Sequence, residues 1–465
     1  MRYIGPFLKM NNISLDEIQH QLFFFSKEAI KNIVLQSKCG IIHTSKNHKK
    51  HSDNTDDNIF KNYSPLICIY KKASPQPETK DSLSWDPECF KKNVLIISNA
   101  LMTLCILELA EYYSHFENIN ENLYKFSNIY KKSAKNQLEF YSAYLRNSLG
   151  VFVDKKMVSS EDISFVNKND KFKYSDQAFM MNAYYLYSKM CPDDKDSEVY
   201  KDFSSDILNM LIDFKEELYH LSFTESSRLC LALNTYCIYS GDDKAKELLI
   251  DILDLCKSNY MSDIYNSNNI ETESLFCINL YLLYNLTGYS DAIDTFLKVS
   301  EKQISLFDQK SSMFCKASHK KNITYSCNEI INYIVNGVLY HEVSESKDTQ
   351  NIISSFYKEV MLRGSLVTSW PKIPNIDSPE RYRNYSLKSD EMLAETYFSV
   401  PNLNPLEFTG LMPIFNKEIT YSRKKECFTS AKNTFYSEKN MLIFFISILL
   451  FRKNVFKTTN LQQDI

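Results

Sequence analysis

The sequence contains very little glycine. Only eight of its 465 residues are glycine, and no two of them lie close together. Glycine-rich phosphate loops and the dinucleotide-binding fingerprint both need clustered glycines, so the sequence predicts no such cofactor site. The formal net charge is only −3, and this balance gives no indication of nucleic acid or of an anionic membrane as a partner.

The sequence also lacks the features of a secreted or membrane protein. Residues 1–6 contain no apolar run that leads to a small-residue cleavage site, so we expect no signal peptide. The apolar run at residues 441–451 is about half as long as a bilayer span requires, which favours a buried helix. The twelve cysteines show no framework spacing and fall mostly within predicted helices. This usage is typical of a reducing compartment, and we expect a cytoplasmic protein.

What the sequence does contain is a helical repeat over residues 174–361. Each copy begins with a Ser or Thr that can accept hydrogen bonds from the free N–H groups at a helix start. These residues are Ser175, Thr224, Thr272 and Ser326, with spacings of 49, 48 and 54 residues.

Each capping residue is followed by an apolar helix, a tight turn and a second, amphipathic helix. Residues 275–284 are apolar on every side, which indicates a helix buried all round. Turns at Gly241 and Gly288 then lead into segments with one apolar face. Buried helices therefore alternate with half-exposed ones, and hairpins of this kind bury their apolar faces only by stacking on one another.

The flanking segments extend this pattern. Ser14, with Glu17 three residues later, predicts a capped helix over residues 14–37. The remaining expected elements are two extended runs (39–44 and 65–70), a linker (73–84), a buried helix (93–110) with its companion (121–146), long connections (148–173 and 363–388), a short helix (390–398), an irregular or extended segment (399–428) and a closing helix (428–451).

Counting these elements gives six inner helices, which start near residues 93, 176, 225, 273, 327 and 390. The outer helices start near residues 121, 198, 244, 290, 349 and 429. This layout resembles the (α/α)6 toroid of the six-hairpin glycosidases and related polysaccharide lyases, over about residues 85–455. We therefore predict an all-α fold with a toroid domain (85–465) and a small N-terminal α+β extension (1–84).

The long connections precede inner helices, so they gather at the end of the ring where those helices begin. The resemblance places the mouth of a substrate funnel at the same end. Glycoside hydrolysis needs two carboxyl groups, one protonated and one ionised. The candidate catalytic pair comes from Asp176, Glu225, Glu273 and Asp390. The alternative is that each acid simply caps its own helix, where the dipole favours it.

Four further side chains are candidates for substrate binding in this mouth. Arg228 could hold a substrate carboxylate, or it could form an ordinary salt bridge. Gln177 lies one residue after Asp176, and Trp85 and Trp370 are the only tryptophans. The two indole rings could stack on sugars, or they could anchor loops.

Two groupings of Cys and His were weighed as metal sites. They are Cys39 with His43, His48 and His51, and Cys315 with His319. Neither has the spacing of a known zinc site, and both fall in Lys- and Ser-rich loops. We predict no metal.

Three functional hypotheses remain open. The first is an enzyme that acts on oligosaccharides, and the second is a non-catalytic scaffold that binds a protein or a small ligand. The third is a toroid of another chemistry, such as a lanthionine or terpene cyclase. It is the weakest, because the sequence offers neither a convincing zinc-ligand set nor an Asp-rich run within an inner helix.

Overall fold

The computed structural model describes residues 13–43, 60–79, 82–159, 163–168, 171–262, 269–316, 320–372, 374, 378–381, 411–429 and 433–456. The predicted short helix at 390–398 lies outside these residues, as does the candidate Asp390.

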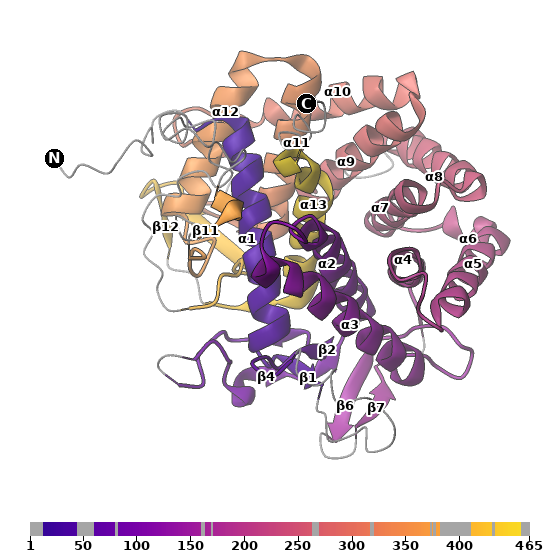
Figure 1. Ribbon diagram of the computed structural model, residues 1–465. Coiled ribbons are helices and arrows are strands. Elements are labelled where there is room, and N and C mark those ends of the chain that lie inside the picture. Colours follow the sequence, from indigo (N-terminus) through magenta and orange to yellow (C-terminus); the bar gives the residue numbers. More distant parts are fainter. Residues whose placement is uncertain are drawn as a thin grey trace.

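Within the described residues, six helices form a closed inner ring (Figure 1). They are α2 (Ile96–Ser114), α4 (Tyr174–Met190), α7 (Phe223–Ser240), α9 (Ile270–Thr287), α11 (Cys327–Ser344) and α13 (Ser437–Phe456). Each packs against the next, and α13 packs back against α2. The ring closure itself establishes the predicted (α/α)6 toroid.

An outer helix covers each inner one. Five outer helices follow their partners in sequence: α3 (Glu121–Tyr144), α5 (Ser197–Asp213) with the short α6 (Lys215–Leu218), α8 (Asp243–Met261), α10 (Ser290–Ile304) and α12 (Lys347–Lys358). The sixth is α1 (Leu15–Gln36), which packs along α13.

The sixth hairpin corrects one prediction. The closing helix was expected in the outer ring, but α13 belongs to the inner ring because its side chains from Met441 to Ile446 are all buried. Its outer partner comes from the opposite end of the sequence. The contacts between α1 and α13 therefore cross the predicted domain boundary at residue 84.

Some helix boundaries follow the predicted local signals, but α4, α7 and α9 begin after Lys173, Ser222 and Asn269 and not at the predicted caps Ser175, Thr224 and Thr272. Ser14 and Glu17 form the predicted capping box of α1, and Ser326 forms a second one at the start of α11. Gly241 and Gly288 end α7 and α9 with φ angles of 70° and 71°, a left-handed conformation that favours glycine. The turns from α7 into α8 and from α9 into α10 are short for this reason.

Small antiparallel sheets accompany the long connections. The strands are β1 (Gly40–Ile42) with β2 (Leu66–Ile69); β4 (Phe90–Lys91), β3 (Lys72–Ala73) and β13 (Phe435–Tyr436); β5 (Asn93–Val94), β6 (Lys155–Ser159) and β7 (Ser164–Asn167); β8 (Phe307–Asp308) with β9 (Met313–Phe314); and β10 (Asn322–Ser326), β11 (Glu418–Ser422) and β12 (Cys427–Thr429). The pairing of β1 with β2 confirms the two predicted extended runs. Because β5, β10 and β13 lead directly into α2, α11 and α13, they border the end of the ring where the inner helices begin.

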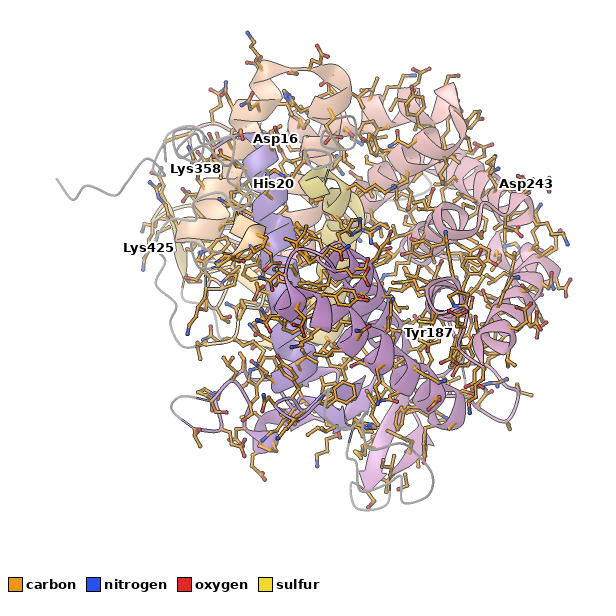
Figure 2. The ribbon with its side chains drawn as sticks, in the orientation of Figure 1. Asp16, His20, Tyr187, Asp243, Lys358 and Lys425 are labelled. Atoms are coloured by element: carbon orange, nitrogen blue, oxygen red, sulfur yellow. The ribbon has the colours of Figure 1, made fainter. Side chains whose placement is uncertain are left out.

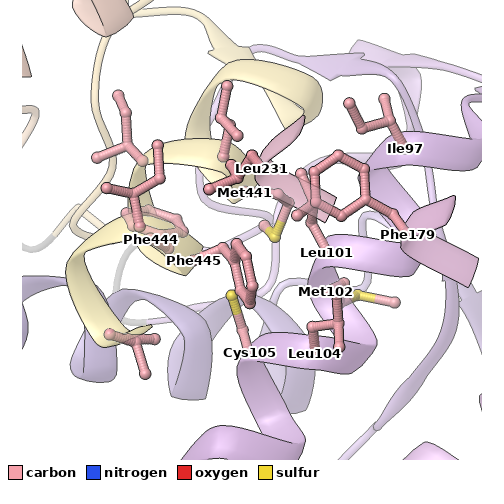
Figure 3. Close-up of a cluster of buried hydrophobic side chains, with 14 of the residues drawn as sticks. Ile97, Leu101, Met102, Leu104, Cys105, Phe179, Leu231, Met441, Phe444 and Phe445 are labelled. Atoms are coloured by element: carbon pink, nitrogen blue, oxygen red, sulfur yellow. The ribbon is translucent and has the colours of Figure 1, made fainter. Parts of the chain in front are cut away.

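Apolar side chains fill the middle of the ring. Figure 3 shows Leu101, Phe179, Leu231, Met441 and Phe445 converging from four inner helices, and all are buried. One described helix, α2, is long and apolar enough to cross a membrane by length and composition, and nearly all of it is buried in this core. The apolar core separates the two ends of the ring from each other.

Asparagine side chains tie neighbouring inner helices together. Asn182 of α4 donates from Nδ2 to the carbonyl oxygen of Ala232 in α7 (2.8 Å). Asn279 of α9 donates in the same way to the carbonyl of Ser227 (2.8 Å). Buried amides require partners, so these bonds fix how far each helix is shifted along its neighbour.

Candidate functional site

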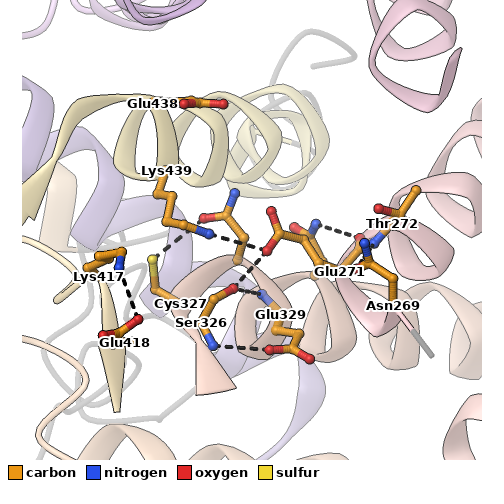
Figure 4. Close-up of polar contacts among 12 residues, drawn as sticks. Asn269, Glu271, Thr272, Ser326, Cys327, Glu329, Lys417, Glu418, Glu438 and Lys439 are labelled. Carbon is orange, nitrogen blue, oxygen red and sulfur yellow. Dashed lines mark hydrogen bonds and ion pairs between the residues drawn. The ribbon is translucent and has the colours of Figure 1, made fainter. Parts of the chain in front are cut away.

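Charged side chains from four inner helices meet at the end of the ring where these helices begin. We call them the N-terminal cluster: Asp176, Glu225, Arg228, Glu271, Glu438 and Lys439. Arg228 of α7 forms an ion pair with Glu438 of α13 (2.9 Å), and Lys439 of α13 pairs with Glu271 of α9 (3.3 Å). Figure 4 shows the second of these contacts.

Asp176 is the most unusual member of the cluster. Its side chain is only 3% exposed, and Oδ1 has no hydrogen-bond partner. Burial raises its pKa to about 8. The negative charges of Asp154 and Glu225 also raise the pKa, whereas the positive charges of Lys173 and Arg228 lower it. At neutral pH this carboxyl group is therefore mostly protonated, unlike an ordinary aspartate.

Glu438 behaves in the opposite way. Burial alone would raise its pKa, but the charges of Arg228 and Lys173 outweigh burial, so the pKa lies below its usual value. Sequence reasoning missed this residue, because its helix was assigned to the outer ring. The signal was an acid in the first turn of an apolar helix, the same signal that identified the other candidates.

Glu225 and Glu271 link helices across the cluster. Glu225 Oε1 accepts a hydrogen bond from the backbone N–H of Ser175 (3.0 Å), which places the carboxylate of α7 at the start of α4. Glu271 Oε2 accepts from the hydroxyl of Ser326 (2.7 Å) and from Lys439 (Figure 4). Each carboxylate therefore has a structural role in addition to its place in the cluster.

Glu273 lies apart from this cluster. Its Oε2 accepts from Nε2 of Gln303 in the outer helix α10 (3.3 Å), and burial raises its pKa. The side chain faces the interface between α9 and α10. The structure therefore brings together Asp176 and Glu225 but does not bring Glu273 to them.

The predicted substrate-binding residues have partners within the protein. Gln177 donates to and accepts from the backbone of Phe152 (2.8 and 2.9 Å), which anchors the connection before α4. Trp85 is buried against Phe435, and Trp370 is buried against Phe25. In this structure both tryptophans anchor loops, and Arg228 makes the salt bridge that was weighed as its alternative role.

Each of the two groupings weighed as metal sites includes a histidine outside the described residues. His48, His51 and His319 lie outside the described residues. Among the residues that are described, no three His, Cys, Asp or Glu side chains are grouped as metal ligands would be. All twelve cysteines are free thiols.

Comparison with known proteins yields similarity in fold alone. No family model matches the sequence, and no curated protein matches it. The chain is similar to a glycoside hydrolase family 76 mannosidase from Bacteroides thetaiotaomicron, with 9% identity, coverage of 93% of this chain and 99% of that one, and a TM-score of 0.47. It is also similar to cellobiose 2-epimerase from Spirochaeta thermophila (11% identity, 82% and 90% coverage, TM-score 0.45). A third similar structure is the unsaturated glucuronyl hydrolase from a Bacillus species (12% identity, 70% and 94% coverage, TM-score 0.40).

These three neighbours are carbohydrate-active enzymes by their names.

Proposed function

We propose that this protein is a carbohydrate-active enzyme of the glycoside-hydrolase type, with Asp176 as its proton donor. The observation that carries the proposal is the buried carboxyl group of Asp176, which has one unpaired oxygen and a pKa that burial raises, at the same end of the ring as Glu438, whose pKa is lowered by Arg228 and Lys173. Glycoside hydrolysis needs such a division, because one group must donate a proton to the leaving oxygen while another acts as base or nucleophile.

Glu225 is the proposed partner of Asp176. Its charge acts directly on Asp176, so the two carboxyl groups are near neighbours. Arg228 and Lys439 are half-buried cations within the same cluster, and they would bind oxygen atoms of an oligosaccharide or of another small ligand. The free thiols support a reducing, cytoplasmic location as part of this proposal.

A panel of mono- and oligosaccharides, including uronic acids, tests the proposal by thermal shift. A ligand that binds only the folded protein raises its melting temperature, and each hit would then be assayed for hydrolysis. We expect Asp176→Asn and Glu225→Gln to fold and to lose all hydrolysis. The matched control is Asp243→Asn, because Asp243 is exposed on α8 at the outer edge of the molecule (Figure 2). Hydrolysis that survives in Asp176→Asn would refute the proposed role of Asp176.

A non-catalytic scaffold is the second candidate. Hydrogen bonds and ion pairs within the protein already occupy some of the acids at this end of the ring, which favours a structural role for them. Glu329 completes the capping box of α11 and pairs with Lys316, and Glu225 accepts a hydrogen bond at the start of α4. If the sugar panel gives no shift, this hypothesis gains weight, and a protein partner becomes the next target.

A further inference from the structure

The opposite end of the ring contains a cavity of about 790 Å³, which we call the C-terminal cavity. Polar side chains from the last two turns of all six inner helices line it, among them Glu108, Lys189, Tyr239, Tyr281, Glu342 and Arg452. Its volume is that of a small-molecule site. The apolar core of the ring separates this cavity from the N-terminal cluster, so a ligand here would occupy a second, independent site.

The base of the cavity is apolar. Leu186, Leu282, Leu339 and Phe451 line it and are buried within the ring. A hydrocarbon portion of a ligand would be removed from water by contact with these side chains, which favours binding in proportion to the area covered.

The electrostatics of this end favour a positive ligand. All six inner helices end here, so the negative ends of their dipoles point towards the cavity. Two acids of α2 are already neutralised, because Arg452 Nη1 lies 2.8 Å from Glu108 Oε2 and 2.6 Å from Glu111 Oε2. Lys189 is also engaged, since its Nζ donates to the backbone carbonyl of Tyr239 (2.6 Å). Lys453 is exposed at the rim, and its charge acts on Glu108.

Glu342, which is exposed to solvent at the opening of the cavity, is the lining carboxylate without such a partner. Its Oε2 accepts from the hydroxyl of Tyr281 (2.9 Å), and its Oε1 accepts from Nε2 of Gln19 (3.0 Å). Both donors are neutral, and within the described part of the chain no lysine or arginine forms an ion pair with Glu342. An acid near the end of a helix is disfavoured by the dipole, so an ammonium group bound beside Glu342 would relieve this repulsion.

We propose that the C-terminal cavity binds a small organic amine. The ammonium group contacts the Glu342 carboxylate, and the alkyl portion lies against Leu282 and Leu339. Leu339 and Glu342 are three residues apart on α11 and share a face of that helix. One ligand can therefore contact both.

Calorimetric titration of the full chain at pH 7 with three probes of equal length tests this inference. The probes are n-hexylamine, 1-hexanol and hexanoate. We expect n-hexylamine to bind about threefold to fivefold more tightly than 1-hexanol, and hexanoate to bind most weakly. Glu342→Gln should weaken n-hexylamine by about the same factor and leave 1-hexanol unchanged. Glu247→Gln, at an exposed position on α8, is the matched control and should bind all three probes as the wild type does.

Three results would overturn the inference: no heat with n-hexylamine up to millimolar concentrations, equal affinity for the amine and the alcohol, or full amine affinity in Glu342→Gln. The comparison of amine with alcohol uses the wild-type protein, so it decides the question even if the variant does not fold. None of these results bears on the role of Asp176, which lies at the other end of the ring.

Discussion

The two ends of this ring are built from the same six helices, yet they differ in loop length, burial and charge. At the N-terminal end, long connections and small sheets surround ion pairs in which Arg228 and Glu438 stay 14% and 21% exposed. At the C-terminal end, turns are short and a cavity opens over an apolar base, where the paired Glu108 is only 1% exposed. Helix direction explains much of this difference, because it sets which backbone groups and which dipole ends each opening presents.

The largest expected effect is at the C-terminal end. Arg452→Met leaves Glu108 buried beside Tyr239 without its cation, and breaking a buried pair costs about 3–5 kcal/mol. Burial already raises the pKa of Glu108, so protonation offsets part of this cost and the loss should be near the lower end of that range. Urea unfolding at pH 7 should show this loss of stability. The double variant Arg452→Met/Glu108→Gln should recover part of it, since the uncompensated charge is then gone. A single variant as stable as the wild type would mean that Glu108 is not ionised in the folded protein.

The next effect concerns pH at the N-terminal end. The pKa of Asp176 is raised from its ordinary value to about 8 in the folded state, so the folded protein holds a proton that the unfolded chain has released. The free energy of unfolding of the wild type should therefore decrease as the pH rises from about 4 through 8. Asp176 contributes at most about 1.4 kcal/mol per pH unit to this decrease.

Asp176→Asn removes this contribution to the pH dependence. Its melting temperature should match the wild type near pH 5 and exceed it at pH 9. A variant that melts below the wild type across the whole range would show that the ionised carboxylate is needed for folding.

A smaller effect is expected for the ion pair of the N-terminal cluster. Arg228→Met removes the partner of Glu438, but both side chains are more exposed than Glu108, so the cost should be smaller than for Arg452→Met, about 1–3 kcal/mol. Denaturant unfolding of Arg228→Met and Arg452→Met side by side measures the contrast directly. Equal losses would mean that the two ends do not differ in burial as the structure indicates.

The smallest effect is expected for Glu273, which lies near the start of α9 but outside the N-terminal cluster. Burial already favours its neutral form, so Glu273→Gln should change the free energy of unfolding by less than about 1 kcal/mol at pH 5. Chemical denaturation at that pH provides the measurement. A larger loss would indicate that its carboxyl group holds α9 and α10 together more strongly than a single bond to Gln303 implies.

Local sequence signals predicted most of the ring. Capping residues such as Ser326, turn glycines such as Gly241 and apolar runs each act over a few residues, so the repeat from α4 to α12 could be recognised directly. The sixth hairpin could not, because periodicity shows that a helix has a buried face but not which distant helix covers it. The pairing of α1 with α13 depends on tertiary packing between segments that are far apart in the sequence.

The candidate site shows the same limit. Asp176 and Glu273 both stand near the start of an inner helix, yet only the first joins the N-terminal cluster. Which way such a side chain points depends on the rotation of the helix about its axis, and that rotation is set by packing. The catalytic roles of Asp176 and Glu225 stay predictions.

The pairing of α1 with α13 also has a consequence during protein synthesis. The 400 residues between Gln36 and Ser437 must be translated after α1 before the helix that covers it begins to emerge. At about 5–20 residues per second this takes roughly 20–80 s. Throughout that interval the apolar face of α1, including Phe25 and Ile30, has no native partner in α13 and must be kept from other contacts until α13 is made.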